Sequence, residues 1–160
     1  MKKVIIHSAL LVILSLQLLN KAHSGEIDSF DLNQYKGKVV YLDFWASWCV
    51  PCRKSFPWMN QLTEEYSTAD LVIIAVNLDK KEELAEEFLK ENPANFDIFY
   101  DPKGVLAKRF KIKGMPSSVI FDRAGKPVAA HTGFFVKKIQ QYEHEIIDAI
   151  GNEANNSDPK

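Results

Sequence analysis

The segment FWASWCVPCRK, residues 44–54, contains both cysteines of the 160-residue chain, Cys49 and Cys52. Only two residues separate them, so a disulfide between them closes a very short loop. The entropy that a cross-link removes from an unfolded chain grows with the length of the loop it closes. A structural cross-link is therefore a poor explanation for this pair, and we expect it to react or to bind a ligand.

The residues on either side place the cysteines between a strand and a helix. Residues 38–45, KVVYLDFW, form a nearly continuous apolar run, which is typical of a buried central strand. The pattern becomes helical from about residue 50 to residue 66. Free N–H groups and the helix dipole at such an N-terminus stabilise a thiolate. We therefore expect Cys49 to be the exposed nucleophile and Cys52, one turn later, to be its buried resolving partner.

Other uses of a cysteine pair fit the chain less well. A structural zinc site needs two further ligands, and His131 and His144, the histidines that follow residue 24, are spaced too widely for a finger half-site. Covalent haem attachment needs a histidine directly after the second cysteine, where this chain has Arg53. Inert buried thiols remain an alternative, but the position between strand and helix favours a redox pair. We predict no metal and no cofactor.

Strands and helices alternate along the rest of the chain. Strand patterns cover residues 71–78, 96–100, 116–122 and 127–133, and helical patterns cover residues 82–92, 105–110 and 136–150. Early strand–helix–strand units imply parallel strands, and a hairpin turn at residues 123–126 adds antiparallel ones. The order predicts an α/β fold, a three-layer α/β/α sandwich around a mixed central sheet.

The periodicity also predicts which side chains face inward. In the helix at residues 82–92 we expect an inward face of Leu84, Phe88 and Leu89. In the last helix we expect an inward face of Val136, Ile139, Tyr142, Ile146, Ile147 and Ile150. Three polar residues lie near the predicted strand ends, where they could line the rim of the cysteine site but are more often caps and turn residues, namely Asn77, Asp79 and Asp101.

The ends of the chain differ from its centre. Residues 1–24 combine two early lysines, a broken apolar run and small residues before position 25, which is typical of a secretory signal peptide cleaved after Ser24. An uncleaved membrane anchor is the alternative, although the apolar run is short for a span of about 20 residues. Residues 152–160 are polar, and we expect a disordered tail. The folded domain is predicted at residues 25–151.

Charge and export restrict the possible partners. The formal net charge of the chain is −1, and removal of a signal peptide with three lysines and no acid would make it about −4. A mildly acidic domain without a basic block is a poor binder of phosphate backbones, so we predict no nucleic-acid partner. Outside the cytoplasm a cysteine pair is oxidised by default, and its thiols need an electron donor to stay reduced.

The segment DFWASWCVPCRKSFP, residues 43–57, resembles the active-site segment of the thioredoxin superfamily. Pro57 falls in the following helix, where this superfamily often has a proline, and Met115-Pro116 precedes a strand, where it has a cis-proline. The segment between the second strand and Met115 resembles the βα insertion of exported TlpA-like and ResA-like thiol–disulfide oxidoreductases. The resemblance spans residues 29–150 and implies a thioredoxin-like fold with a TlpA-type βα insertion.

This resemblance implies roles for three residues. Cys49 attacks a substrate disulfide, Cys52 resolves the mixed disulfide, and Asp43 matches the buried acid that accepts the proton of the second thiol. Independently, an aspartate inside the apolar run VVYLDFWA is expected to be buried, which raises a carboxyl pKa toward the range useful for proton transfer. The alternative is a structural or solvent-facing Asp43.

The resemblance also predicts where a substrate binds. Pro116 shapes the groove, and the backbone of Met115 pairs with the substrate chain. Trp48 is expected to provide an apolar platform beside Cys49. Val50 and Pro51, between the cysteines, complete the predicted substrate-binding set.

We expect a monomeric periplasmic enzyme that reduces disulfides in exported proteins and is itself reduced by a membrane thiol donor. Cytochrome c biogenesis is one usual context of such proteins, but its dedicated branch usually has an acidic residue where this chain has Ser117. A disulfide oxidase or isomerase is the alternative, although the dipeptide Val50-Pro51 lacks the histidine that often makes such pairs oxidising. A dithiol copper chaperone or binding module is a third hypothesis.

Overall fold

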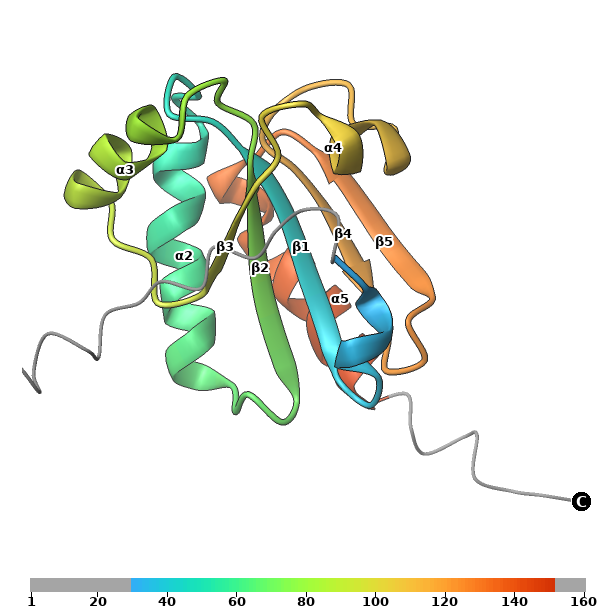
Figure 1. Ribbon diagram of the computed structural model, residues 1–160. Helices are drawn as coiled ribbons and strands as arrows, with labels where there is room; N and C mark the ends of the chain where they lie inside the picture. The colour runs from blue at the N-terminus through green and yellow to red at the C-terminus, as the bar shows by residue number, and fades with distance from the viewer. Residues whose placement is uncertain (1–29, 152–160) are drawn as a thin grey trace, which may run out of the picture.

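The computed structural model describes residues 30–151 of the protein (Figure 1). The predicted signal peptide, the predicted tail and the first residues of the predicted domain, 25–29, lie outside the described residues. Between residues 30 and 151, no helix combines the length and the hydrophobicity that crossing a membrane requires.

Five strands form one mixed sheet in the order β3–β2–β1–β4–β5. Strands β1, β2 and β3 are parallel, whereas β4 is antiparallel to β1 and β5 is antiparallel to β4. The strands are Val39–Trp45 (β1), Leu71–Asn77 (β2), Asp97–Tyr100 (β3), Ser117–Phe121 (β4) and Pro127–Thr132 (β5). The predicted mixed sheet is confirmed, because parallel neighbours are joined by helical crossovers and the antiparallel pair by a tight turn.

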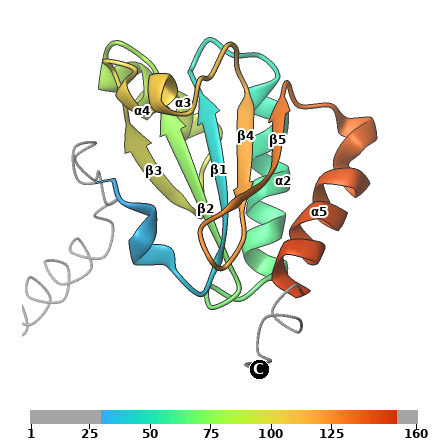
Figure 2. The ribbon, with the colours of Figure 1, turned by 90° about the vertical axis from the view of Figure 1, so that its right-hand side faces the viewer.

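Helices cover both faces of this sheet (Figures 1 and 2). Residues of α2 (Cys52–Glu65), α3 (Glu82–Glu91) and α5 (Ile139–Gly151) share one apolar core with the sheet. A second core, on the other face, is flanked by α4 (Val105–Arg109) and by the 3-10 helix η2 (Leu32–Tyr35). The predicted three-layer α/β/α fold is therefore confirmed.

Strand β1 lies at the centre of the sheet, and all seven of its residues are buried. Because side chains alternate along a strand, Val39, Tyr41 and Trp45 pack in the core beneath α2 and α5. Val40, Leu42 and Phe44 pack in the opposite core. Asp43 belongs to the first set by this alternation, so its carboxyl faces the layer that contains α2.

The segment between β2 and β4 forms the predicted βα insertion. It folds as α3, β3 and α4, and β3 extends the sheet by pairing in parallel with β2. Phe88 of α3 packs against Trp45 and Phe56, with ring centroids 4.8 and 5.1 Å away. This contact places α3 beside the end of β1, where the cysteines follow.

Some predicted inward faces are wrong by about one residue. Leu84 is exposed, because the buried stripe of α3 passes through Ala85 and Phe88. Val136 is exposed because it begins a 3-10 turn, Val136–Lys138, ahead of α5. The buried residues of α5 are Tyr142, Ile146 and Ala149, which leaves Ile147 exposed. A change of one residue turns a helical face by about 100°.

Candidate active site

A short turn carries the chain from β1 to the cysteines. The N–H of Cys49 donates to the carbonyl of Ala46 at 3.0 Å, and the N–H of Cys52 donates to the carbonyl of Cys49 at 3.1 Å. Helix α2 begins at Cys52, with Pro51 as its N-cap. Cys49 thus lies in the turn three residues before the helix. The predicted helix, starting at about residue 50, would have placed Cys49 directly before its first residue.

The two cysteines form a disulfide, with their Cα atoms 5.4 Å apart. Cys49 keeps only 3% of its surface exposed and Cys52 keeps none. The expectation that Cys49 is exposed is therefore wrong for the oxidised protein, because the disulfide turns its side chain toward the buried Cys52. The predicted order of burial is nevertheless present, since Cys49 is the more accessible of the two.

Apolar side chains surround this disulfide on the surface. Trp48 and Val50 each expose 67% of their surface, although both are large and apolar. Pro51 is exposed beside them. Exposed aromatic and aliphatic groups are typical of surfaces that contact another polypeptide. The three side chains predicted to bind substrate next to Cys49 thus form one accessible apolar rim.

Asp43 is buried on the helix side of β1. Its Oδ2 atom receives no hydrogen bond from residues 30–151. Burial alone raises the pKa of the Asp43 carboxyl well above its usual range, because the charged form loses its hydration. Both cysteines belong to the core on this same face of the sheet. A carboxyl in this state can take up a proton at a pH where exposed aspartates stay ionised.

The predicted cis-proline is present, because the Met115–Pro116 peptide bond is cis. Strand β4 starts at Ser117, which pairs with Phe44 near the end of β1. The loop before β4 and the turn before α2 therefore lie at the same end of the sheet (Figure 1). Met115 packs against the core that contains both cysteines. The structure thus brings together the chain segments of the predicted site.

Asp79 holds the active-site turn from the neighbouring strand. Its carboxylate accepts hydrogen bonds from the Ser47 N–H at 2.8 Å and the Ser47 hydroxyl at 2.9 Å. The Asn77 amide donates to the same carboxylate at 2.8 Å. This contact fits the alternative that Asp79 lies at the rim of the site, although sequence reasoning did not identify Ser47 as its partner. The signal was available, because parallel neighbours β1 and β2 end at the same edge of the sheet, so residues that follow them can meet.

Asp101 fits the interpretation as a cap. Its carboxylate accepts from the N–H groups of Val105 and Ala107, at 2.6 and 3.0 Å, at the start of α4. These bonds satisfy amides that have no partner inside the helix. Asp101 therefore belongs to the scaffold of the insertion.

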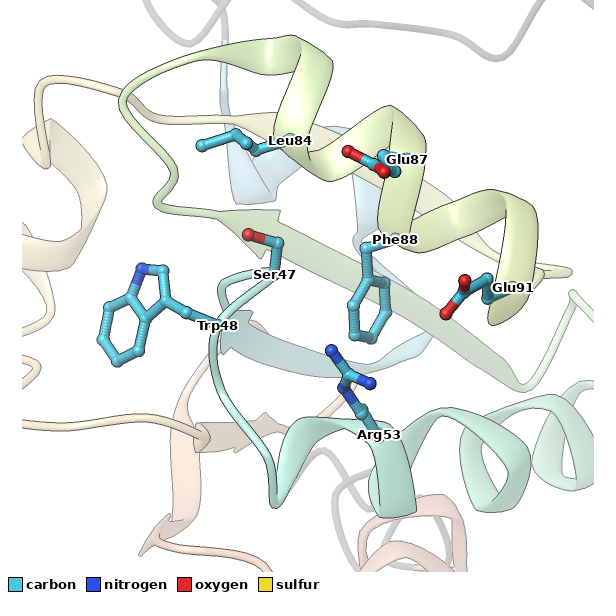
Figure 3. A pocket seen from close by; sticks show the side chains of 7 residues that line it. All are labelled: Ser47, Trp48, Arg53, Leu84, Glu87, Phe88 and Glu91. Carbon is cyan, nitrogen blue, oxygen red and sulfur yellow. The ribbon is translucent and has the colours of Figure 1, made fainter.

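A cavity of about 300 Å³ lies between the active-site turn and α3 (Figure 3). Phe88 of α3 and Arg53 of α2 both line it, and the guanidinium carbon of Arg53 lies 5.8 Å from the ring centroid of Phe88. Trp48 and Leu84 expose apolar surface at its edge. The remaining side chains that line it are Ser47, Glu87 and Glu91. This cavity adds a mixed apolar and charged surface to the rim around Cys49.

Known proteins match both the sequence and this structure. The AhpC/TSA family model matches residues 15–130. The thiol–disulfide oxidoreductase ResA of Bacillus thuringiensis subsp. konkukian (strain 97-27) is 32% identical over 117 residues, which cover 72% of this chain and 68% of ResA. A crystal structure from Chlorobium tepidum, assigned to the thiol:disulfide interchange protein DsbE, superposes with a TM-score of 0.73 and 47% identity, covering 75% of this chain and 85% of that one.

A further similar structure is the exposed lipoprotein thioredoxin Etrx1 of Streptococcus pneumoniae strain TIGR4. It superposes with a TM-score of 0.61 and 30% identity, covering 71% of this chain and 88% of that one. The family model, the relatives and the cysteine pair all agree. The chain therefore belongs to the AhpC/TSA family of the thioredoxin superfamily, and it is a thiol–disulfide oxidoreductase.

Proposed function

We propose that the protein is a disulfide reductase that acts on exported proteins through a Cys49–Cys52 dithiol cycle. The observation that carries the direction is the electrostatic environment of the pair. A nearby positive charge stabilises the thiolate and makes a cysteine pair oxidising. Here Val50 and Pro51 supply no charge, and the carboxylate of Asp79 binds Ser47, two residues before Cys49. The dipeptide between the cysteines thus adds no cation that would stabilise a thiolate, which favours the reductase over an oxidase.

Two exchange steps transfer two electrons. The Cys49 thiolate attacks one sulfur of the substrate disulfide, and the other substrate sulfur leaves and takes a proton from water. Cys52 then gives its proton to the Asp43 carboxylate, and its thiolate attacks the sulfur of Cys49. The bond between Cys49 and the substrate breaks, and the second substrate thiolate is protonated by solvent. The substrate is reduced to a dithiol and the enzyme is oxidised to the disulfide.

The apolar rim would hold the substrate during these steps. Trp48, Val50 and Pro51 offer exposed apolar area around Cys49. Met115 would pair through its backbone with an extended segment of the substrate, and Pro116 would shape the groove beside it. These roles follow from the thioredoxin-superfamily resemblance, and the position of both segments at one end of the sheet supports them.

Residues 1–24 and the relatives support a location outside the cytoplasm. The segment has the composition of a secretory signal, and the pneumococcal relative is an exposed lipoprotein. In a periplasm the protein would act as a monomer and would need a membrane thiol donor to regenerate its dithiol, because the compartment is oxidising. Ser117 argues against a dedicated cytochrome c maturation enzyme and leaves a wider choice of exported substrates.

The reduction potential of the Cys49–Cys52 pair tests this proposal. The protein would be equilibrated with thiol–disulfide buffers of graded potential and the dithiol fraction measured by alkylation. A value near that of thioredoxin, about −270 mV, supports a reductase. A value near about −120 mV, which is typical of strong periplasmic oxidants, would overturn the direction and indicate a disulfide-forming enzyme.

A further inference from the structure

Three polar residues form a row across neighbouring strands behind the active site. Asp43 of β1 pairs directly with Ser118 of β4, and Ser118 pairs directly with His131 of β5. Cross-strand partners present their side chains on the same face of a sheet, about 5 Å apart. Ile120 and Ala129, two residues from Ser118 and His131, pack in the core beneath α2 and α5. The row therefore faces this helix layer, as Asp43 does.

Polar contacts continue the row from β4 to helix α5. The hydroxyl of Ser118 lies 3.3 Å from Nδ1 of His131, and Nε2 of His131 lies 2.7 Å from Oε2 of Glu145. That oxygen is buried and receives no well-aligned hydrogen bond within residues 30–151, so the short imidazole contact is the polar contact it has. The side chains of His131 and Glu145 expose 14% and 26% of their surface. The row thus begins at buried Asp43 and ends at solvent.

We propose that Ser118, His131 and Glu145 form the route by which the proton taken up by Asp43 exchanges with solvent. The inference rests on the proton-accepting role of Asp43 in the proposed function. That role leaves a difficulty, because a fully buried carboxyl with a proton must lose it before the next cycle. The Ser118–His131 and His131–Glu145 contacts are present, and the Asp43 carboxyl, whose Oδ2 receives no hydrogen bond from the described residues, joins them when it turns toward its strand partner Ser118.

The transfer balances without any other reactant. Protonated Asp43 gives its proton to the Ser118 oxygen while the Ser118 hydroxyl proton moves to Nδ1 of His131. The resulting imidazolium gives its Nε2 proton to the Glu145 carboxylate, which releases it to water. Asp43 is left as a carboxylate, Ser118 and His131 are neutral again, and one proton has reached solvent. Reduction of the Cys49–Cys52 disulfide would run the same route inward.

The groups packed around the row do not offer an equivalent relay. Tyr41 of β1 hydrogen-bonds Ser118 and is itself buried, so its hydroxyl joins the row at Ser118 and gives no separate exit to solvent. Strand β2 places Ala75 opposite Asp43. From α5, the Tyr142 ring packs on His131 with centroids 4.7 Å apart.

A second acid of α5, Glu143, is already engaged by Trp58 of α2. The indole N–H of Trp58 donates to Oε1 of Glu143 at 3.0 Å, and the Trp58 ring packs edge-on against Tyr41, with centroids 5.5 Å apart. An indole N–H only donates hydrogen bonds and cannot pass a proton onward. Glu143 is therefore separated from Asp43 by a group that blocks transfer, whereas Glu145 is connected to it through an imidazole.

The competing explanation is structural, because the same contact fixes α5 against edge strand β5. His131→Gln separates the two explanations, since an amide can keep hydrogen bonds but cannot relay a proton. His144→Gln is the matched control, because His144 also contacts an acid of α5, Asp148, at 3.4 Å, but both are exposed.

The experiment measures proton release and disulfide exchange in the same reaction. Reduced protein is mixed with a disulfide-bonded peptide in weak buffer, with tryptophan fluorescence following the cysteines and a pH-indicator dye following protons. We expect His131→Gln and Glu145→Gln to slow the release of protons to the dye, after the mixed disulfide has been resolved, by about tenfold near neutral pH. The alkylation rate of Cys49 should be unchanged, and Asp43→Asn/His131→Gln should be no slower than Asp43→Asn.

Each other outcome has a defined meaning. Rates of proton release by His131→Gln and Glu145→Gln within twofold of the wild type, with a slow Asp43→Asn, would overturn the relay and leave the proposed function intact. Additive losses in the double variant would also overturn it, because residues on one route cannot add. If Asp43→Asn itself were as fast as the wild type, the relay would be wrong together with the proton role of Asp43. The reduction potential reports on the direction of the reaction independently of all these rates.

Discussion

Asp43 lies in β1 and Asp79 follows the neighbouring parallel strand β2, and the surroundings of these two buried aspartates are opposite. Asp79 accepts hydrogen bonds from the Ser47 N–H, the Ser47 hydroxyl and the Asn77 amide. Asp43 has an oxygen that no described residue satisfies, and burial raises the pKa of its carboxyl. The hydrogen-bonded carboxylate of Asp79 holds the turn in place. The carboxyl of Asp43, which lacks such partners, can exchange a proton, but its burial lowers the stability of the fold. Burial by itself does not tell these roles apart.

The largest expected effect is the loss of the Asp79 contacts. Asp79→Ala leaves a Ser47 N–H and an Asn77 amide without their acceptor, which costs about 3 kcal/mol of the free energy of unfolding. Urea denaturation of the oxidised proteins measures this loss. Asp31→Ala is the control, because the exposed Asp31 only caps the short helix η2, a role worth about 1 kcal/mol. Equal losses in the two variants would contradict the contrast drawn for Asp79.

Removal of the Asp43 carboxyl is expected to raise the free energy of unfolding, whereas removal of the Asp79 carboxylate lowers it. Because its pKa is raised in the folded state, the folded protein holds a proton that the unfolded chain releases above about pH 4. The free energy of unfolding therefore falls as pH rises from there through the folded pKa, and it stays lower above it. Asp43→Ala removes this fall, so the variant should gain about 2 kcal/mol over the wild type at high pH.

Unfolding curves at a series of pH values test this prediction. The gain of Asp43→Ala should vanish below about pH 4, where the wild-type carboxyl is protonated in both the folded and the unfolded states. A constant difference between variant and wild type across the whole range would mean that the Asp43 carboxyl does not titrate abnormally.

The catalytic side of the comparison is tested by Asp43→Asn. An amide cannot accept the Cys52 proton, so release of the mixed disulfide should slow by about tenfold near neutral pH. Single-turnover fluorescence across a pH series measures the rate. The exposed Asp148→Asn serves as the control and should match the wild type. A pH–rate profile of Asp43→Asn that overlays the wild type would remove Asp43 from proton transfer.

The smallest expected effect concerns the exposed rim. Trp48→Ala removes apolar contact area for a substrate, and KM for a protein disulfide should rise about fivefold, which is about 1 kcal/mol. The reduction potential should not change, since the indole of Trp48 carries no charge. Val128→Ala, an exposed apolar residue of β5, is the control. A large change in potential for Trp48→Ala would place the indole in the electrostatics of the pair.

Most of the fold could be predicted from sequence patterns. Apolar runs in β1 and β2 predict buried parallel strands, and those predicted bounds differ from the observed strands by one residue. The inward faces were less predictable, because a helix such as α3 can turn by one residue at little cost until its neighbours fix it. Leu84 is exposed and Ala85 is buried only because Phe88 docks against Trp45 and Phe56.

The chemistry of residues 44–54 can be predicted from the residues in and next to this segment. The CxxC spacing, the strand before it and the helix after it follow from neighbouring residues, so the redox pair and the burial of Asp43 can be inferred without coordinates. The partners of the polar groups cannot, because contacts distant in sequence depend on which strand edges meet and in which register. Ser47 and Asp79 lie 32 positions apart, and the Asp43–Ser118–His131 row exists only because β4 pairs with both β1 and β5 in that register.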